Sequence, residues 1–379
     1  MRRPTVLWLL ALMAVLALAA AACAEDEPDE AAGDAEDEPD DEPDEEPDDE
    51  PDDEPDDEPD EAAESVELTY AFFAPEGTFP AVQMQEWAER LQERTETDVE
   101  VDMFFGGTLL EAGDIYSGVQ QGTADMGLGS PGYDTGQFPL MSGIALPVGF
   151  PNATVASVTL WDLLEEFEPD ELYDDFKVLT AFTTEPAHLM TIDRVEGVED
   201  VEGTDMRATG SGIPVLEAFG ASGTGMPMPE VPEAVETGVI EGVLTSRETL
   251  EDFALAENLG YTVDHPTVVN SFAAVMDLDQ YEGLPADVQE AIDGLGPEMA
   301  EWTGNYHDTD NVEGALEWAD QEHGHEIVEL DEDEAERWDE LMEPITEAWL
   351  DEAEDAGLPG DEFHERMLEL RDEHAEEHG

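Results

Sequence analysis

The sequence is poor in positive charge, in cysteine and in long apolar runs. Its 379 residues include 11 lysines and arginines against 102 aspartates and glutamates, which gives a formal net charge of −91. Nucleic acid is therefore excluded as a partner, because phosphate binding requires a basic surface. The single cysteine, Cys23, excludes a disulfide within the chain. Beyond residue 23, no segment is apolar over enough length to span a bilayer.

The acidity extends over the whole chain. Residues 24–64 hold 27 of the acidic residues and the other 75 lie elsewhere, whereas Lys177 is the single lysine. We interpret this as a surface adapted to high salt, where carboxylates hold water and ions screen their mutual repulsion. An ordinary acidic protein is the alternative.

Residues 1–23 have the composition of a secretory signal. Two arginines precede an apolar stretch, and a run of small residues follows and ends at Cys23. This ending resembles a lipoprotein signal, in which the cysteine thiol receives a diacylglycerol and becomes the mature N-terminus. We therefore expect an extracytoplasmic protein, lipid-anchored to the outer face of the cell membrane. The alternative is an uncleaved membrane helix with an incidental cysteine.

Residues 24–64 form a low-complexity tract in which proline recurs every fourth residue from Pro39 to Pro59. Proline blocks helix and sheet, and the like charges repel one another, so this tract is expected to stay extended and disordered. It is suited to a tether that holds a folded body away from the membrane. A calcium-binding tract is the alternative.

From residue 65 onward, strand and helix patterns alternate, which predicts an α/β fold with parallel sheets. Two such lobes with a cleft between them are the expected architecture, with ligands at the carboxyl ends of the strands. Beyond about residue 284 the chain is expected to be helical to its end. The predicted strands are 65–73, 98–107, 124–130, 176–184, 187–193 and 239–245, and the predicted helices are 78–97, 110–122, 212–220 and 230–238.

Four stretches carry a family resemblance: "FFGGTLLEAGDIYSGVQQGTADMGLGS", "FPLMSGIALPVGFPN", "GTDMRATGSGIPVLEAFGASGTGMPMPEVPEAVETGVIEGVLTS" and "NSFAAVMDLDQYEGLPADVQEAI". They resemble the DctP-type solute receptors of TRAP transporters, in order, over roughly residues 66–300. The resemblance implies a periplasmic-binding-protein-like fold with a hinge and a helical C-terminal region. Lobe I is then expected at 65–186 plus about 272–315, and lobe II at 187–271 plus about 316–379.

The resemblance also implies a function. Such a receptor binds a small organic acid in the cleft and delivers it to an integral-membrane permease with a small and a large subunit. It needs no cofactor and is not an enzyme. A receptor of the same type that serves an ATP-driven importer or a chemoreceptor is the alternative, and a secreted enzyme is a third possibility.

Arg207 stands where the family's arginine forms a bidentate salt bridge with the ligand carboxylate. Guanidinium offers a planar fork that fits a carboxylate and keeps its charge on burial better than lysine does. The alternative is a surface arginine paired with Glu202 or Asp205.

Other positions are candidates for the same cleft. Thr245 occupies the place of an asparagine found in many members, and this departure suggests a different or less polar ligand. His188 aligns with a second basic ligand residue, although it also fits a histidine in the hinge. Arg247 offers a second cation, or pairs with Glu248 or Glu251. The turns and the later strand that should face the cleft contribute Glu76, Ser130, Tyr133, Asn270 and Phe272.

Other chemistry finds little support in the sequence. No nucleophile elbow, P-loop or dinucleotide-binding fingerprint is present. His374 and His378 lie four residues apart and could share a metal ion on one helix face, and His323 and His325 are also close in sequence. Without a further ligand pattern, polar residues on a solvated helix face are the simpler interpretation, and no metal site is predicted.

Overall fold

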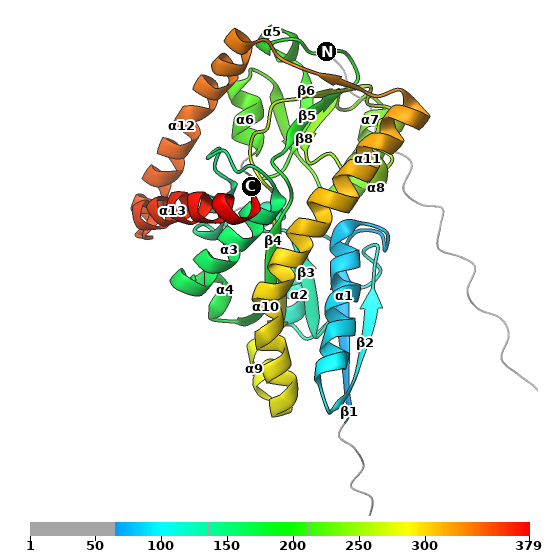
Figure 1. Cartoon of the computed structure of the whole chain (residues 1–379), viewed down its shortest axis with the longest axis vertical. Helices are drawn as coiled ribbons and strands as arrows, with labels where there is room; N and C mark the ends of the chain where they lie inside the picture. The colour runs from blue at the N-terminus through cyan, green and yellow to red at the C-terminus, as the bar shows by residue number, and fades with distance from the viewer. Residues whose placement is uncertain (1–64, 135, 211) are drawn as a thin grey trace, which may run out of the picture. The chain divides into compact units, whose positions relative to one another are not determined.

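The computed structural model describes residues 65–134, 136–210 and 212–379. The predicted signal at 1–23, with Cys23, and the proline-repeat tract at 24–64 lie outside the described residues. The described part is a two-lobed α/β structure with one sheet in each lobe (Figure 1). None of its helices combines the length and the apolar character that a membrane span requires.

The first sheet has the strand order β2-β1-β3-β10-β4. β1 pairs in parallel with β2 and β3, as the alternating patterns predict, but β10 runs antiparallel between β3 and β4. The prediction of an all-parallel sheet was therefore wrong for this lobe. The reason is that β10 enters directly from the other lobe instead of through a helical crossover. The strands are β1 (Ser65–Phe72), β2 (Asp98–Phe104), β3 (Met126–Gly129), β4 (Phe176–Thr183) and β10 (Ser271–Asp277).

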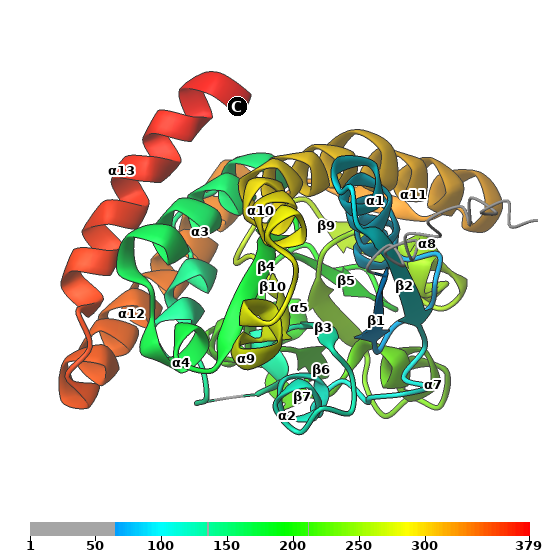
Figure 2. The same ribbon diagram turned by 90° about the horizontal axis from the view of Figure 1, so that it is seen from below.

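Helices bury their apolar stripes against this sheet. The predicted helix at 78–97 is α1. Of its apolar residues at helical spacing, Trp87, Ala88 and Leu91 are buried and Val82 is half-buried, and Trp87 meets Tyr70 of β1 edge to face with ring centroids 5.9 Å apart. Figure 2 shows α1 and α10 lying side by side. The helices of this lobe are α1 (Phe79–Arg94), α2 (Ile115–Gln120), α3 (Ala153–Phe167), α4 (Asp170–Tyr173), α9 (Leu278–Glu282) and α10 (Ala286–Tyr306).

The second sheet has the strand order β11-β9-β5-β8-β6-β7. β6, which carries Arg207, runs parallel to β7 and β8, whereas β5 is antiparallel to β8 and β9. β11 lies in the region that was expected to be entirely helical, so that prediction was wrong there. The strands are β5 (His188–Thr191), β6 (Asp205–Ala208), β7 (Ser222–Gly225), β8 (Gly242–Thr245), β9 (Tyr261–Val263) and β11 (Glu326–Val328).

The C-terminal helices connect the two lobes. Trp338 of α12 is fully buried against Phe219, with ring centroids 4.4 Å apart, which fixes α12 to α6 of the second lobe. α13 packs on α3 of the first lobe through Phe363 and Met367, although it was expected in the second. The lobe boundaries otherwise stay a prediction. The remaining helices are α5 (Val198–Val201), α6 (Gly212–Ala218), α7 (Val231–Glu236), α8 (Thr249–Asp252), α11 (Glu313–Trp318), α12 (Glu332–Ala356) and α13 (Gly360–His378).

The chain crosses between the sheets in two adjacent segments, 184–187 and 264–270. The two segments are hydrogen-bonded to each other, from Thr184 N to Asn270 O at 2.9 Å and from Ala187 N to Val268 O at 2.7 Å. A third connection is helical, because α10 continues through a π-helical stretch, His307–Val312, into α11, which packs on α8 (Figure 1). These crossings are the places where a hinge between the lobes would bend.

Asp308, in the π-helical stretch, anchors the beginning of α3. Its carboxylate accepts from the backbone N–H groups of Ala153 and Thr154, each at 2.9 Å, and from the Thr154 hydroxyl at 2.7 Å. We expect Asp308→Ala to lower the free energy of unfolding by about 1–3 kcal/mol, because these helix-terminal donors lose their acceptor. Denaturant titration measures this, with the exposed Asp310→Ala as the control. Equal effects of the two changes would contradict the assigned role.

Candidate functional site

A cavity lies between the two lobes, at the end of β6 and β8. It is lined from the first lobe by the loops after β1 and β3, from the second by β6 and the turn after β8, and by both crossing segments. The empty space measures about 480 Å³ with its opening included, but only about 40 Å³ of it could hold the centre of a water molecule. The lobes therefore stand closed over the cavity, and a ligand larger than water would enter with the lobes further apart.

The lobes approach each other closely beside this cavity. A Cβ atom on Gly210, which has a φ of +47°, would lie 3.3 Å from the Cα of Gly132 in the other lobe. The backbone N–H of Phe79 donates across the gap to Asp252 at 3.2 Å, and that of Met228 donates to the Tyr133 hydroxyl at 3.1 Å. Closure thus depends on backbone approach at glycines and on polar contacts between the lobes.

Arg207 is the cation of this cavity. Its side chain is only 1% exposed. Nε and Nη2 donate to the Met226 carbonyl at 3.0 and 2.9 Å, and Nη2 lies 3.5 Å from the Tyr133 hydroxyl. No carboxylate of residues 65–134, 136–210 or 212–379 forms an ion pair with it. The alternative prediction, in which Arg207 is a surface residue paired with Glu202 or Asp205, is therefore wrong.

Burial of a guanidinium without a counter-ion has an electrostatic cost. Loss of water lowers the pKa of Arg207 below its usual range, and the neighbouring Tyr133 offsets only part of this. An isolated buried charge is strongly unfavourable unless it is paired and hydrogen-bonded. The site is consequently suited to an anion that completes the pair.

Most of the predicted cleft residues lie together. Five of them line the same cavity as Arg207 although they come from separate parts of the chain. They are Ser130, Tyr133, Thr245, Asn270 and Phe272.

Two predicted residues, Glu76 and His188, do not line the cavity. Glu76 is exposed at the outer tip of its turn, whereas Ala74 and Thr78, on either side of the turn, line the cavity. His188 is buried in β5, with Nε2 at 3.9 Å from Asp264. Burial lowers the pKa of His188 to about 4, so the imidazole is neutral at pH 7 and does not supply a second positive charge.

Arg247 is a structural cation. Its predicted partners were Glu248 and Glu251, but it binds Glu185 in the crossing segment, from Nε to Oε1 at 2.9 Å and from Nη2 to Oε2 at 2.6 Å. Burial by itself would raise the pKa of Glu185, yet the hydrogen bonds and charge of Arg247 bring it below its usual value. A guanidinium that is already bound bidentately to a carboxylate is not available to a ligand.

Two carboxyl groups also line the cavity, and neither was predicted there. Glu248 is fully buried, and this burial, together with nearby Asp252, raises its pKa well above the usual value. Burial likewise raises the pKa of Asp252 to about 6, although the Phe79 N–H and Asn311 partly stabilise its charge. In sequence, "ETLED" has the appearance of a solvated helix start, so nothing in its composition signalled buried acids.

Aromatic side chains make up much of the remaining lining. The first lobe contributes most of them from the segment "FFAPEGTFP", which the sequence analysis assigned to a strand and a helix start without marking a binding wall. Phe79 meets Phe272 edge to face, and Phe182 stacks on Phe272 with centroids 5.4 Å apart. The aromatic residues that line the cavity are Phe72, Phe73, Phe79, Tyr133, Phe253 and Phe272.

A second, larger hollow lies between α12 and the crossing segments, and it shares Ser130, Thr209 and Asn270 with the first. Its charged lining residues are Asp134 and Glu352, both acids, so it offers no cation for an anionic ligand. The first cavity differs in that Arg207 lines it.

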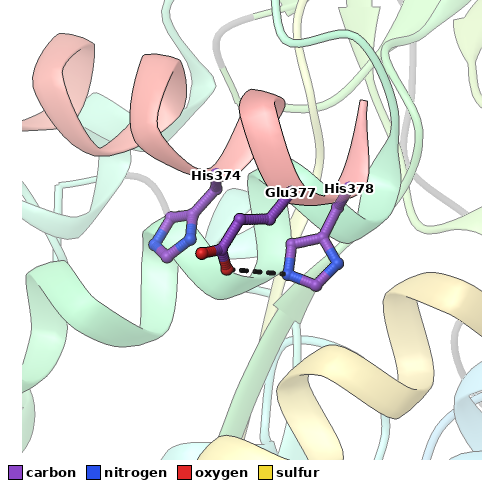
Figure 3. A group of neighbouring side chains, drawn as sticks. All are labelled: His374, Glu377 and His378. Atoms are coloured by element: carbon purple, nitrogen blue, oxygen red, sulfur yellow. Dashed lines mark ion pairs between the residues drawn. The ribbon is translucent and has the colours of Figure 1, made fainter.

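The histidines considered for metal binding do not line the cavity. His374, Glu377 and His378 gather on the last turns of α13, with ligand atoms within 4.8 Å of one another (Figure 3). His374 Nε2 already bonds Asp162 of α3 at 2.8 Å, and this contact fastens α13 to α3. Glu377 is exposed, so a solvated helix face accounts for the group.

Comparison with known proteins agrees with this geometry. Residues 71–352 match the model of a family described as bacterial extracellular solute-binding protein, family 7, DctP. The chain belongs to this family. Family 7 members and the solved neighbours below are solute-binding receptors rather than enzymes.

Solved structures of family 7 receptors extend the match to most of the chain. A TRAP periplasmic solute-binding protein from Desulfovibrio salexigens, in an open complex, is 38% identical with a TM-score of 0.72, over 81% of this chain and 95% of that one. Another from Bordetella bronchiseptica, with bound (R)- and (S)-mandelate, is 25% identical with a TM-score of 0.75, over 81% and 99%.

A curated family 7 relative matches over a shorter range. The C4-dicarboxylate-binding periplasmic protein DctP of Rhodobacter capsulatus is 27% identical over 153 residues, which is 39% of this chain. The match spans 44% of that relative, less than half of its length.

The Glu185–Arg247 pair should make the free energy of unfolding of this chain depend on pH. We expect Glu185→Gln to lower the free energy of unfolding at pH 7 by about 3–5 kcal/mol, because it leaves a buried guanidinium unpaired. Since the folded pKa of Glu185 lies below its unfolded value of 4.5, its contribution is present above pH 4.5 and disappears as the pH falls through the folded pKa.

Denaturant titrations from pH 7 down to pH 3 test this expectation. The matched control is Glu196→Gln, which removes an exposed pair with Arg194 and should change stability by at most about 1 kcal/mol. A difference between wild type and Glu185→Gln that persists unchanged below the folded pKa would contradict the assignment.

Proposed function

We propose that the chain is an extracytoplasmic receptor that closes over a small organic acid, and that this acid carries an aromatic ring. The observation that supports this most directly is the buried guanidinium of Arg207, which has no carboxylate partner among the described residues. A ligand carboxylate would supply the missing charge and accept the free guanidinium N–H groups. The bound ligand would then be in contact with both lobes.

The lining of the cavity supports the aromatic part of the proposal. Six aromatic side chains face the cavity, and the threonine at position 245 replaces a longer polar side chain. Aromatic rings prefer edge-to-face contacts such as those between Phe79 and Phe272. The mandelate bound to the relative from Bordetella bronchiseptica is an aromatic carboxylate, which is consistent with the same ligand class.

Delivery of the ligand would require a membrane partner. Family membership supports a TRAP-type permease with small and large integral-membrane subunits as that partner. We further propose that the chain is tethered to the membrane by a diacylglycerol on Cys23 and the acidic tract 24–64, and that its acidic surface is an adaptation to high salt.

Thermal unfolding with candidate ligands tests the binding proposal. A panel of aliphatic and aromatic mono- and dicarboxylates, in molar salt, should include acids that stabilise the folded chain by RT ln(1 + [L]/Kd), or about 2.7 kcal/mol at 100 Kd. Arg207→Ala should abolish these shifts, because a buried charge-assisted contact is worth about 2–5 kcal/mol.

The matched control is Arg194→Ala, which removes an exposed arginine from the same lobe. It should keep every shift seen in the wild type. Equal shifts in the wild type and in Arg207→Ala would refute Arg207 as the anchor.

The lipid anchor has its own test. In cells that process lipoproteins, Cys23→Ser is expected to move the chain from the detergent phase to the aqueous phase in a phase-separation assay, because a diacylglycerol contributes about 0.8 kcal/mol per buried CH₂ group. Retention of the variant in the detergent phase would favour the uncleaved membrane helix.

A further inference from the structure

Glu248 is a buried acid whose hydrogen bonding is incomplete. Its side chain is 3% exposed and lines the cavity. Oε1 accepts from the Ser246 hydroxyl at 2.8 Å. Oε2 has no hydrogen-bond partner among the residues that the structure describes.

A second incomplete group lies beside it. Nε2 of His307 is 3.7 Å from Oε2 of Glu248, too far for a hydrogen bond, and it likewise has no partner within the described part of the chain. The other ring nitrogen, Nδ1, is 3.1 Å from Oδ1 of Asn311. Because an amide oxygen accepts, Nδ1 carries the proton and Nε2 is left as an acceptor.

Such a pair calls for an explanation. A buried polar atom without a partner costs about 1–3 kcal/mol, and native proteins contain few of them. Here two such atoms lie 3.7 Å apart, and Glu248, which carries one of them, lines the cavity, whereas the fully buried His307 does not. A small polar ligand group at Glu248 would complete the hydrogen bonding of its carboxyl group.

The surroundings hold Glu248 in place but leave its Oε2 without a partner among the described residues. Ser246 fixes Oε1, and the Thr249 hydroxyl donates to the Ser246 carbonyl at 2.7 Å. Asp252, the other acid, already accepts from the Phe79 N–H and from Asn311. Phe79 covers His307, with ring centroids 4.2 Å apart.

The protonation state of Glu248 determines which kind of ligand group it can bind. Burial raises the pKa of Glu248 well above its usual value, which favours the protonated carboxyl, a group with one O–H donor besides its acceptors. A neutral hydroxyl matches such a group, since it can accept from an O–H and donate to a carboxyl oxygen. Arg207 and Glu248 form no ion pair, so they would contact different parts of a ligand.

We propose that Glu248 forms a second polar subsite in the cavity, which binds a hydroxyl group on the aromatic carboxylate that Arg207 anchors. The chain thereby selects hydroxy-substituted aromatic acids over their unsubstituted and methyl-substituted counterparts. This inference rests on the proposed function, because it assumes that Arg207 binds the carboxylate of the same ligand.

The test measures, by titration calorimetry, the affinity of the full chain for benzoate and for pairs of substituted benzoates. Each pair consists of a hydroxybenzoate and the methylbenzoate that carries its methyl group at the same ring position. Methyl and hydroxyl groups are similar in size, so the ratio of the two dissociation constants isolates the hydrogen bonds. In the wild type, at least one hydroxybenzoate should bind about tenfold or more tightly than its methyl counterpart.

Two substitutions at position 248 separate hydrogen bonding from packing. Glu248→Met should bring this ratio to within about threefold of one, because the thioether has no O–H donor and accepts only weakly. Glu248→Gln should keep a preference for hydroxyl, since the amide is neutral and still donates and accepts. The control is Glu251→Met on the same helix, an exposed position, which should keep the wild-type ratio.

The outcomes are distinguishable. Absence of any hydroxyl preference in the wild type, or an unchanged preference in Glu248→Met, would overturn the subsite. Tighter binding of an aminomethyl-substituted benzoate than of its hydroxyl counterpart would show an ionised Glu248 and would overturn it too. If Glu248→Met does not fold, the wild-type ratios and Glu248→Gln still decide. If no carboxylate binds, or binding ignores Arg207→Ala, the proposed function fails instead.

Discussion

The burial of one guanidinium without a carboxylate partner is the constraint on which the rest of the cleft depends. Arg207 is buried, and among the described residues the Met226 carbonyl and the Tyr133 hydroxyl are the groups that accept from its nitrogen atoms. Tyr133 comes from the first lobe and Arg207 from the second, so the lobes must be closed for this contact to exist. The position of the cation and the closure of the cleft are therefore coupled, and an anion bound there would stabilise both.

The contrast with Arg247 shows how the same residue type serves two purposes. Arg247 lies two residues beyond Thr245, which lines the cavity, yet Glu185 accepts from its Nε and Nη2 at short distances. Glu185 belongs to the segment by which the chain first crosses between the lobes, so this pair fixes the second sheet to the hinge. Arg207 differs from Arg247 because no carboxylate of the described residues forms an ion pair with it. In a chain with 102 acidic residues, such an environment requires that apolar side chains pack closely around the guanidinium.

The sequence predicted those features that repeat along the chain or match a family pattern. Alternation found β1, β2 and β4, and helical spacing found the buried face of α1. β7, "SGTG", has no apolar side chain to mark it, and β11 is three residues long within an acidic stretch. Glu248 and Phe79 were missed because their role arises when segments distant in sequence meet. Glu76 was expected in the cleft from its turn alone, but the tip of that turn faces solvent.

The strong negative charge of the chain repels an anionic ligand such as the one proposed for the cleft. This repulsion acts over longer distances than the contact between the ligand and Arg207. Repulsion from surface carboxylates is screened beyond about 10 Å at 0.1 M salt and beyond about 3 Å at 1 M. The contact between a carboxylate and Arg207 forms inside a closed, water-poor cavity, where salt screens much less. Rising salt should therefore remove the barrier to approach faster than it weakens the bound contact. A surface of this composition can thus coexist with an anion site, provided that the cation is buried, as Arg207 is.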